Sequence, residues 1–84
     1  MNDQVSEGVR LLLRRHNPAG KPIGPATDLA ADLSIDSVAA MDLIMEVEER
    51  FGVDIPINLL PDLVTAGDLE DLVRRQIATR GGAA

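Results

Sequence analysis

The sequence predicts an all-α protein, a small four-helix bundle with three main helices, a short third helix and a long loop between the first and second helices. Three observations predict this class. Apolar residues recur at helical spacing in three separate segments, and only the connector at residues 53–55 resembles a strand. The length of 84 residues suits one domain. Hydrophobic residues make up 45% of the chain but aromatic residues only 1%, and such an aliphatic core favours packed helices.

The first helix is expected over residues 3–16, where Pro18 ends it. Basic residues in its last turn, including His16, complement the negative end of the helix dipole. We interpret His16 in this way rather than as a catalytic group. Its apolar stripe consists of Val5, Val9, Leu12 and Leu13.

Residues 17–27 carry three prolines and two glycines and are expected to form a loop. We expect Ile23, Leu29 and Leu33 to hold this loop against the core, with a short helical turn near residues 28–31.

The second helix is expected to begin at Asp36 or Ser37 and to end at Phe51 or Gly52. It has more apolar residues than one buried stripe requires. We expect Leu43, Val47 and Phe51 to face the core, and Val38, Met41 and Met45 to lie on a neighbouring, partly exposed face.

Residues 53–56 are expected to form an extended connector, because the residue before a proline avoids the helical region. Pro61 limits any helix in residues 57–63 to a single short turn. Thr65 and Asp68 resemble a capping box before a last helix that ends near Thr79. We expect residues 1–80 to form one domain and residues 81–84 a disordered tail. The stripe of the last helix consists of Leu69, Leu72, Val73 and Ile77.

Composition excludes several classes of function. The chain has no cysteine, which excludes disulfides, thiolate metal sites and cysteine nucleophiles. It has neither a signal-peptide pattern nor an apolar run of roughly 18 residues, so we expect a cytoplasmic protein without membrane insertion. Residues 28–71 hold twelve acids and one base. This acidic stretch repels nucleic acid and favours basic protein surfaces, although it could also be an ordinary solvated face.

The residues offer little for catalysis or metal binding. The only histidine lies in the first helix, away from any serine with an oxyanion hole, so no catalytic residues are assigned. Asp28, Asp32 and Asp36 lack the pattern of an EF-hand loop, and no metal ligands are assigned.

The tripeptide 36–38, Asp-Ser-Val, stands where the loop gives way to the second helix. Helix capping is the simplest interpretation of Asp36 and Ser37. The residues around them change this interpretation, because segments 28–29, 33–38, 41–56 and 65–69 together resemble an acyl carrier protein in order and spacing. The resemblance extends from about Thr27 to Ile77, and the first helix agrees only in length and pattern.

The resemblance implies that Ser37, beside Asp36, carries a covalent 4′-phosphopantetheine group taken from coenzyme A by a holo-carrier synthase, a phosphopantetheinyl transferase. It implies a non-catalytic carrier, a monomer, whose thiol-ended arm holds acyl groups as thioesters and whose interior can shelter the acyl chain. Its acyl-loading and acyl-transferring partners have basic docking patches. The matching acidic positions are Asp36, Asp42, Glu46, Glu48 and Glu49, with Val38, Met41 and Met45 as apolar contacts.

The sequence also departs from the carriers of fatty acid synthesis. Val38 replaces the usual leucine, Ala39 stands where an acid is usual, and residues 57–62 are apolar and interrupted by Pro61 where those carriers have an acidic helix. These departures favour a specialised bacterial carrier for a dedicated lipid, lipid-modifying or polyketide pathway. A polyketide or peptidyl carrier and a cofactor-free acidic adaptor remain alternatives, although peptidyl carriers usually have Gly-Gly where this chain has Ser34 and Ile35.

Overall fold

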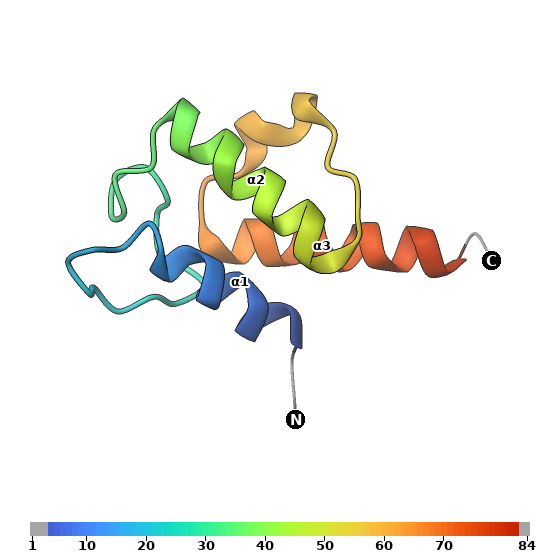
Figure 1. Cartoon of the computed structure of the whole chain (residues 1–84), viewed down its shortest axis with the longest axis horizontal. Coiled ribbons are helices and arrows are strands. Elements are labelled where there is room, and N and C mark those ends of the chain that lie inside the picture. Colours follow the sequence, from blue (N-terminus) through green and yellow to red (C-terminus); the bar gives the residue numbers. More distant parts are fainter. Residues whose placement is uncertain (1–3, 83–84) are drawn as a thin grey trace.

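A computed structural model describes the backbone of residues 4–82 and the side chains of residues 4–79. The elements are α1 (Gln4–Arg14), α2 (Ser37–Phe51), the 3₁₀ helix η1 (Ile57–Asp62) and α3 (Ala66–Gly82). Figure 1 shows α2 crossing in front of α3 and α1 lying below them in the view, with the long loop between α1 and α2 at one end of the molecule. The predicted all-α class, with three main helices and a long first loop, is confirmed.

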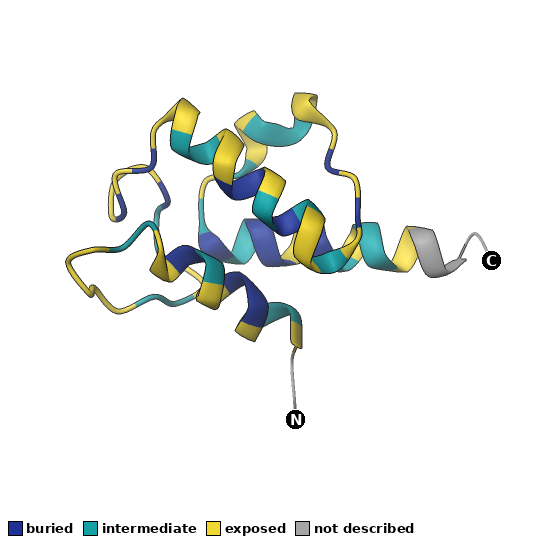
Figure 2. Cartoon of the chain, in the orientation of Figure 1, coloured by how far each residue is buried: buried dark blue, intermediate teal, exposed yellow. Residues whose placement is uncertain are grey.

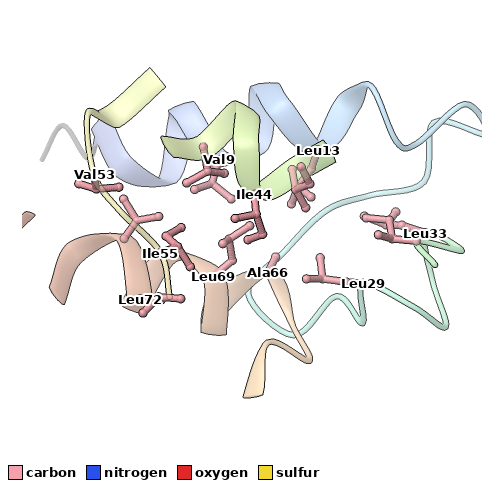
Figure 3. Close-up of a cluster of buried hydrophobic side chains, with 14 residues drawn as sticks. Val9, Leu13, Leu29, Leu33, Ile44, Val53, Ile55, Ala66, Leu69 and Leu72 are labelled. Carbon is pink, nitrogen blue, oxygen red and sulfur yellow. The ribbon is translucent and has the colours of Figure 1, made fainter. Parts of the chain in front are cut away.

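The core lies where the three α-helices meet, and it is as aliphatic as the composition predicts. Val9 and Leu13 of α1, Val47 of α2, and Leu69 and Val73 of α3 are fully buried. Side chains from the helices and from the connecting segments point toward one another there (Figure 3). The helix stripes predicted from apolar spacing therefore form the core.

Two helix ends differ from the prediction. α1 ends at Arg14, because the N–H groups of Arg15 and His16 bond to carbonyls three residues earlier, which tightens the chain into a 3₁₀ turn before Pro18. α3 continues beyond the expected end at Thr79 through Gly82, since no proline stops it. Asp3, the first residue of the expected first helix, and the last two residues of the expected disordered tail lie outside the described residues.

The second helix has the predicted bounds and caps. It begins at Ser37, and it ends at Phe51 where Gly52 adopts the left-handed conformation with φ 64° and ψ 39°. The N–H of Gly52 donates to the carbonyl of Glu48 at 2.9 Å. The helix stop predicted at this glycine is confirmed.

The segment after Pro56 is longer than the predicted single turn. η1 has six residues, about two turns of 3₁₀ helix, and Pro61 lies inside it. The prediction was wrong because it considered only an α-helix, whose ladder a proline breaks. At its two ends the N–H of Leu59 donates to the carbonyl of Pro56 and the N–H of Leu63 to the carbonyl of Leu60, each at 3.0 Å and each with the three-residue spacing of a 3₁₀ helix.

The long loop is fastened to the start of α3. The N–H of Leu29 donates to the carbonyl of Val64, and the N–H groups of Ala66 and Gly67 donate to the carbonyls of Thr27 and Pro25, all at 2.9 Å. Leu29 and Leu33 are buried, and Ile23 packs against the core. The predicted anchoring of the loop is confirmed.

Candidate functional site

The chain turns outward just before Ser37. Ser34 has a positive φ of 56°, and the next residue, Ile35, is buried and donates its N–H to the carbonyl of Leu29 at 3.0 Å. With Ile35 held in the core, Asp36 and Ser37 follow on the surface at the start of α2. The loop thus places the tripeptide 36–38 at an exposed helix end.

Asp36 and Ser37 have different roles in the structure. The side chain of Asp36 accepts a hydrogen bond from the N–H of Ala39 at 2.8 Å, and the Asp36 carbonyl accepts the N–H of Ala40 at 2.8 Å. Asp36 is therefore the N-cap. Ser37 is exposed, and its hydroxyl forms no hydrogen bond with any residue that the structure describes. Helix capping does not account for Ser37.

An apolar hollow lies beside Ser37, between α2 and η1. This Ser37 hollow has a volume of about 330 Å³. A second space of about 280 Å³, the inner cavity, lies deeper between α2, η1 and the start of α3, and the two share Ile35, Ala40 and Leu60 as walls. The remaining walls of the Ser37 hollow are Asp36, Ser37, Met41 and Pro61.

The outward face of α2 carries apolar side chains in solvent. Val38 is 77%, Met45 63% and Met41 40% exposed. Asp42 and Glu49 of the same helix are also exposed. Figure 2 shows exposed residues, in yellow, recurring along α2. The predicted exposure of Val38, Met41 and Met45 is confirmed, and the face combines apolar contacts with negative charge.

Glu46 is bound within the protein. Its carboxylate receives a 2.6 Å hydrogen bond from Arg15 and lies 3.2 Å from Nε2 of His16. Partial burial acts to raise the pKa of Glu46, but the hydrogen bonds to His16 and Arg15 outweigh it and hold the pKa below its usual value. The sequence interpretation of His16 as a helix-end cation missed this contact, because the two segments are about thirty residues apart.

The carboxylate of Glu48 also forms a hydrogen bond within the fold. It is half-buried, and its Oε2 accepts the N–H of Ile55 at 2.8 Å. Of the acidic positions that the family resemblance marks, Asp36, Glu46 and Glu48 therefore make bonds within the fold. Asp42 and Glu49 form no hydrogen bond or ion pair with the described residues.

Asp28 and Asp32 form hydrogen bonds within a turn. Oδ1 of Asp28 accepts the N–H groups of Ala30 and Ala31 at 3.0 and 2.8 Å, and Oδ2 of Asp32 accepts the N–H of Asp28 at 2.8 Å. These bonds build the short helical turn that the sequence predicts near residues 28–31. No group of potential metal ligands occurs among the described residues.

The sequence did not point to Leu60 and Pro61 as neighbours of Ser37. Both line the Ser37 hollow. The sequence does show that Leu59 and Leu60 are apolar residues just before a proline, which indicates a short apolar segment. Their position beside α2 follows from the path of the connector, which no local pattern reveals.

Comparison with known proteins agrees with this geometry. Residues 3–73 match the family described as "Phosphopantetheine attachment site". A "Probable acyl carrier protein" of Caulobacter vibrioides is 41% identical over 61 residues, covering 66% of this chain and 71% of the relative. An acyl carrier protein of Thermosynechococcus vestitus is 39% identical over 54 residues, covering 64% and 67%. The mitochondrial acyl carrier protein of Saccharomyces cerevisiae is 30% identical over 76 residues, covering 84% and 61%.

The match covers α1, the long loop, the exposed serine, α2, η1 and the first part of α3 in one continuous stretch. None of the described helices is long and apolar enough to cross a membrane. The chain belongs to the acyl carrier proteins of the phosphopantetheine-attachment family, whose members are non-catalytic carriers.

Proposed function

We propose that the 4′-phosphopantetheine arm of this carrier is joined to Ser37 and holds acyl intermediates as thioesters for delivery to enzymes of lipid or fatty-acid biosynthesis. The free hydroxyl of Ser37 is the observation that carries this proposal. It is exposed, it forms no hydrogen bond with the described residues, and Asp36 has already capped the helix. The terminal thiol belongs to the arm, which accords with a chain that contains no cysteine.

Attachment is tested by intact-mass measurement after incubation with coenzyme A and a broad-specificity phosphopantetheinyl transferase. We expect one phosphopantetheine on the wild type and none on Ser37→Ala. Ser34→Ala is the matched control, because Ser34 is an exposed serine three residues away. Modification of Ser37→Ala, or loss of modification in Ser34→Ala, would contradict the assignment.

The Ser37 hollow and the inner cavity support shelter of an acyl chain within the bundle. They share three walls, so a chain that enters beside Ser37 meets apolar surface continuously toward Leu43 and Leu69. We expect the larger side chain in Ala40→Leu to block the passage between the Ser37 hollow and the inner cavity. In a holo-carrier loaded with a long acyl chain, this variant should leave the thioester more open to hydroxylamine cleavage than the wild type.

The exposed face of α2 supports docking to basic enzyme surfaces. Asp42 and Glu49 supply charge that is bonded to no described residue, and Val38, Met41 and Met45 supply apolar contact. Such charges mainly accelerate encounter. We expect Asp42→Lys with Glu49→Lys to lower kcat/KM of the phosphopantetheinyl transferase on the order of tenfold at low salt, whereas Asp54→Lys, an exposed acid on the connector, has a small effect.

Two features beside Ser37 support a dedicated lipid pathway rather than the general fatty acid synthase. Ala39 brings no charge next to the attachment point, and η1 presents Ile57, which is 65% exposed, where the resemblance leads us to expect acids. A partner that reads this surface needs apolar contacts near η1. Mass spectrometry of the thioester recovered from cells would identify the acyl class, and ordinary fatty-acid elongation intermediates alone would contradict a dedicated pathway.

A further inference from the structure

A basic groove crosses the outer surface of α1 and reaches the C-terminal end of α2. This arginine groove has a volume of about 640 Å³. It lies far from Ser37, since Arg50 is about 20 Å farther along α2 at the rise of an α-helix. Its walls are Gln4, Glu7, Arg10, Leu11, Arg14, Arg50 and Phe51.

The three arginines of the groove have no acidic partner among the described residues. Arg10, Arg14 and Arg50 are exposed and form no ion pair or hydrogen bond with any residue that the structure describes, Glu7 included. Arg15 and Arg74, by contrast, form ion pairs, Arg15 with Glu46 at 2.6 Å and Arg74 with Asp71 at 3.3 Å. In a chain with fourteen acids and eight bases, three unpaired guanidiniums along one groove concentrate positive potential in one place.

Gly8 makes room for the α2 side of this groove. A Cβ atom at Gly8 would lie 2.5 Å from Cζ of Phe51 and 2.8 Å from Nε of Arg50. The guanidinium of Arg50 therefore rests against α1, and any larger residue would displace it. A glycine inside a helix costs about 1 kcal/mol relative to alanine, and here it permits this close approach.

Positive charge also lines a second hollow on the other side of Arg10 and Arg14. Arg10 and Arg14 also line a hollow of about 420 Å³ with Lys21 and Ile23 of the long loop. Lys21 is held there by a bond of 3.0 Å from Nζ to the carbonyl of Asp32. The basic surface therefore extends over α1 and the loop, and Glu7 is the one acid among the described residues that line the two hollows.

We propose that the arginine groove binds the phosphate group of an organic anion. Guanidinium groups bind phosphate through paired N–H donors and keep their charge at every physiological pH. Leu11, 45% exposed, and the half-buried ring of Phe51 offer apolar surface to the organic part of the ligand. The phosphate ester is the shared chemistry, whether a soluble metabolite or a lipid headgroup supplies it. This proposal does not depend on modification of Ser37.

The test uses Ser37→Ala protein, so that no phosphate of an attached arm enters the measurement. Phenyl phosphate is titrated while NMR follows the Nε–Hε signals of the arginines. We expect saturable shifts at Arg10, Arg14 and Arg50. Arg50→Gln should weaken binding about three- to fivefold, as removal of one exposed charge contact does, and Glu7→Gln should tighten it by a similar factor.

The matched control is Arg75→Gln, which removes an exposed arginine of α3 outside the groove and should leave the affinity nearly unchanged. Shifts that do not saturate, or an equal loss in Arg50→Gln and Arg75→Gln, would overturn the proposal in favour of general charge attraction. Equal affinity for benzoate would overturn the preference for phosphate. Unchanged circular dichroism of each variant shows that the fold is intact.

A second experiment distinguishes the two sources of the phosphate. The Ser37→Ala protein is sedimented with vesicles of phosphatidylglycerol and, separately, of phosphatidylcholine. Sedimentation only with phosphatidylglycerol, lost in Arg50→Gln, assigns a lipid headgroup. Binding of phenyl phosphate without sedimentation assigns a soluble phosphate ester. Absence of both kinds of binding overturns the proposal.

Discussion

Glu48, in the last turn of α2, accepts a hydrogen bond of 2.8 Å from the backbone N–H of Ile55 in the connector. The carbonyl of the same glutamate accepts the N–H groups of Gly52 and Val53. One residue therefore ends the helix through its backbone and fixes the following chain through its side chain. Because Ile55 is buried, this bond also holds the connector against the core.

We expect Glu48→Ala to lower the free energy of unfolding by about 1–2 kcal/mol, because the N–H of Ile55 loses a charged acceptor. Glu48→Gln keeps an acceptor oxygen and should lose less. Urea unfolding monitored by circular dichroism measures both. Glu49→Ala is the control, as Glu49 forms no bond with the described residues, and an equal loss there would show that only helix charge matters.

Alanine substitutions should show that Asp36, and not Ser37, stabilises the start of α2. Asp36→Ala is expected to cost about 1 kcal/mol of stability, because the N–H of Ala39 loses its partner. Ser37→Ala should change stability little, since its hydroxyl bonds to no described residue. Thermal unfolding of the unmodified proteins tests this, and a larger loss in Ser37→Ala than in Asp36→Ala would be inconsistent with the assigned cap.

Gly8→Ala should destabilise the protein although alanine is the better helix former. The added Cβ would lie 2.5 Å from the Phe51 ring, and a crowded site of this kind typically costs about 1–3 kcal/mol. A double-mutant cycle with Phe51→Leu, measured by urea unfolding, isolates the contact. In the Phe51→Leu background we expect Gly8→Ala to be much less harmful; the same loss in both backgrounds would exclude the ring contact as the cause.

The bonds around Glu46 predict a pH dependence. The pKa of Glu46 is lowered in the folded state, so the unfolded chain binds this proton more readily. The stabilisation is therefore present above the ordinary pKa of a glutamate and is lost as the pH falls through the folded value. We expect unfolding free energy to fall less steeply from about pH 6 to about pH 3 in Glu46→Gln than in the wild type.

Asp68 contributes to the same trend in both proteins, since N–H donors of Thr65 and Val64 lower its pKa. Glu49→Gln is the control for loss of a negative charge that has no bonded partner among the described residues. If Glu46→Gln and Glu49→Gln flatten the pH profile equally, the contacts of Glu46 with Arg15 and His16 do not cause the effect.

Features set by neighbouring residues could be predicted from the sequence. Thr65 and Asp68 exchange the reciprocal bonds of a capping box, with the Asp68 N–H on Thr65 Oγ1 at 3.1 Å and the Thr65 N–H on Asp68 Oδ2 at 3.0 Å. The bounds of α2 follow likewise from Asp36 and Gly52. Each of these signals acts within a few residues, so a pattern along the chain contains it.

Features set by distant residues could not be predicted. Nothing near Glu46 distinguishes it from Asp42, yet Glu46 contacts Arg15 and His16, whereas Asp42 forms no bond with the described residues. Gly8 could be interpreted only as a weak point of the helix, because the Phe51 ring that lies against it comes from another element. The assignment of free and bound acids on α2 therefore required the packing of α1 against α2.

The different roles of Asp36 and Ser37 determine how modification would affect the conformation of the protein. Because the helix is capped by the aspartate, a group joined to the serine replaces no bond of the described fold. The attachment that we propose at Ser37 would therefore require no refolding. We expect the unmodified and modified forms to share one conformation.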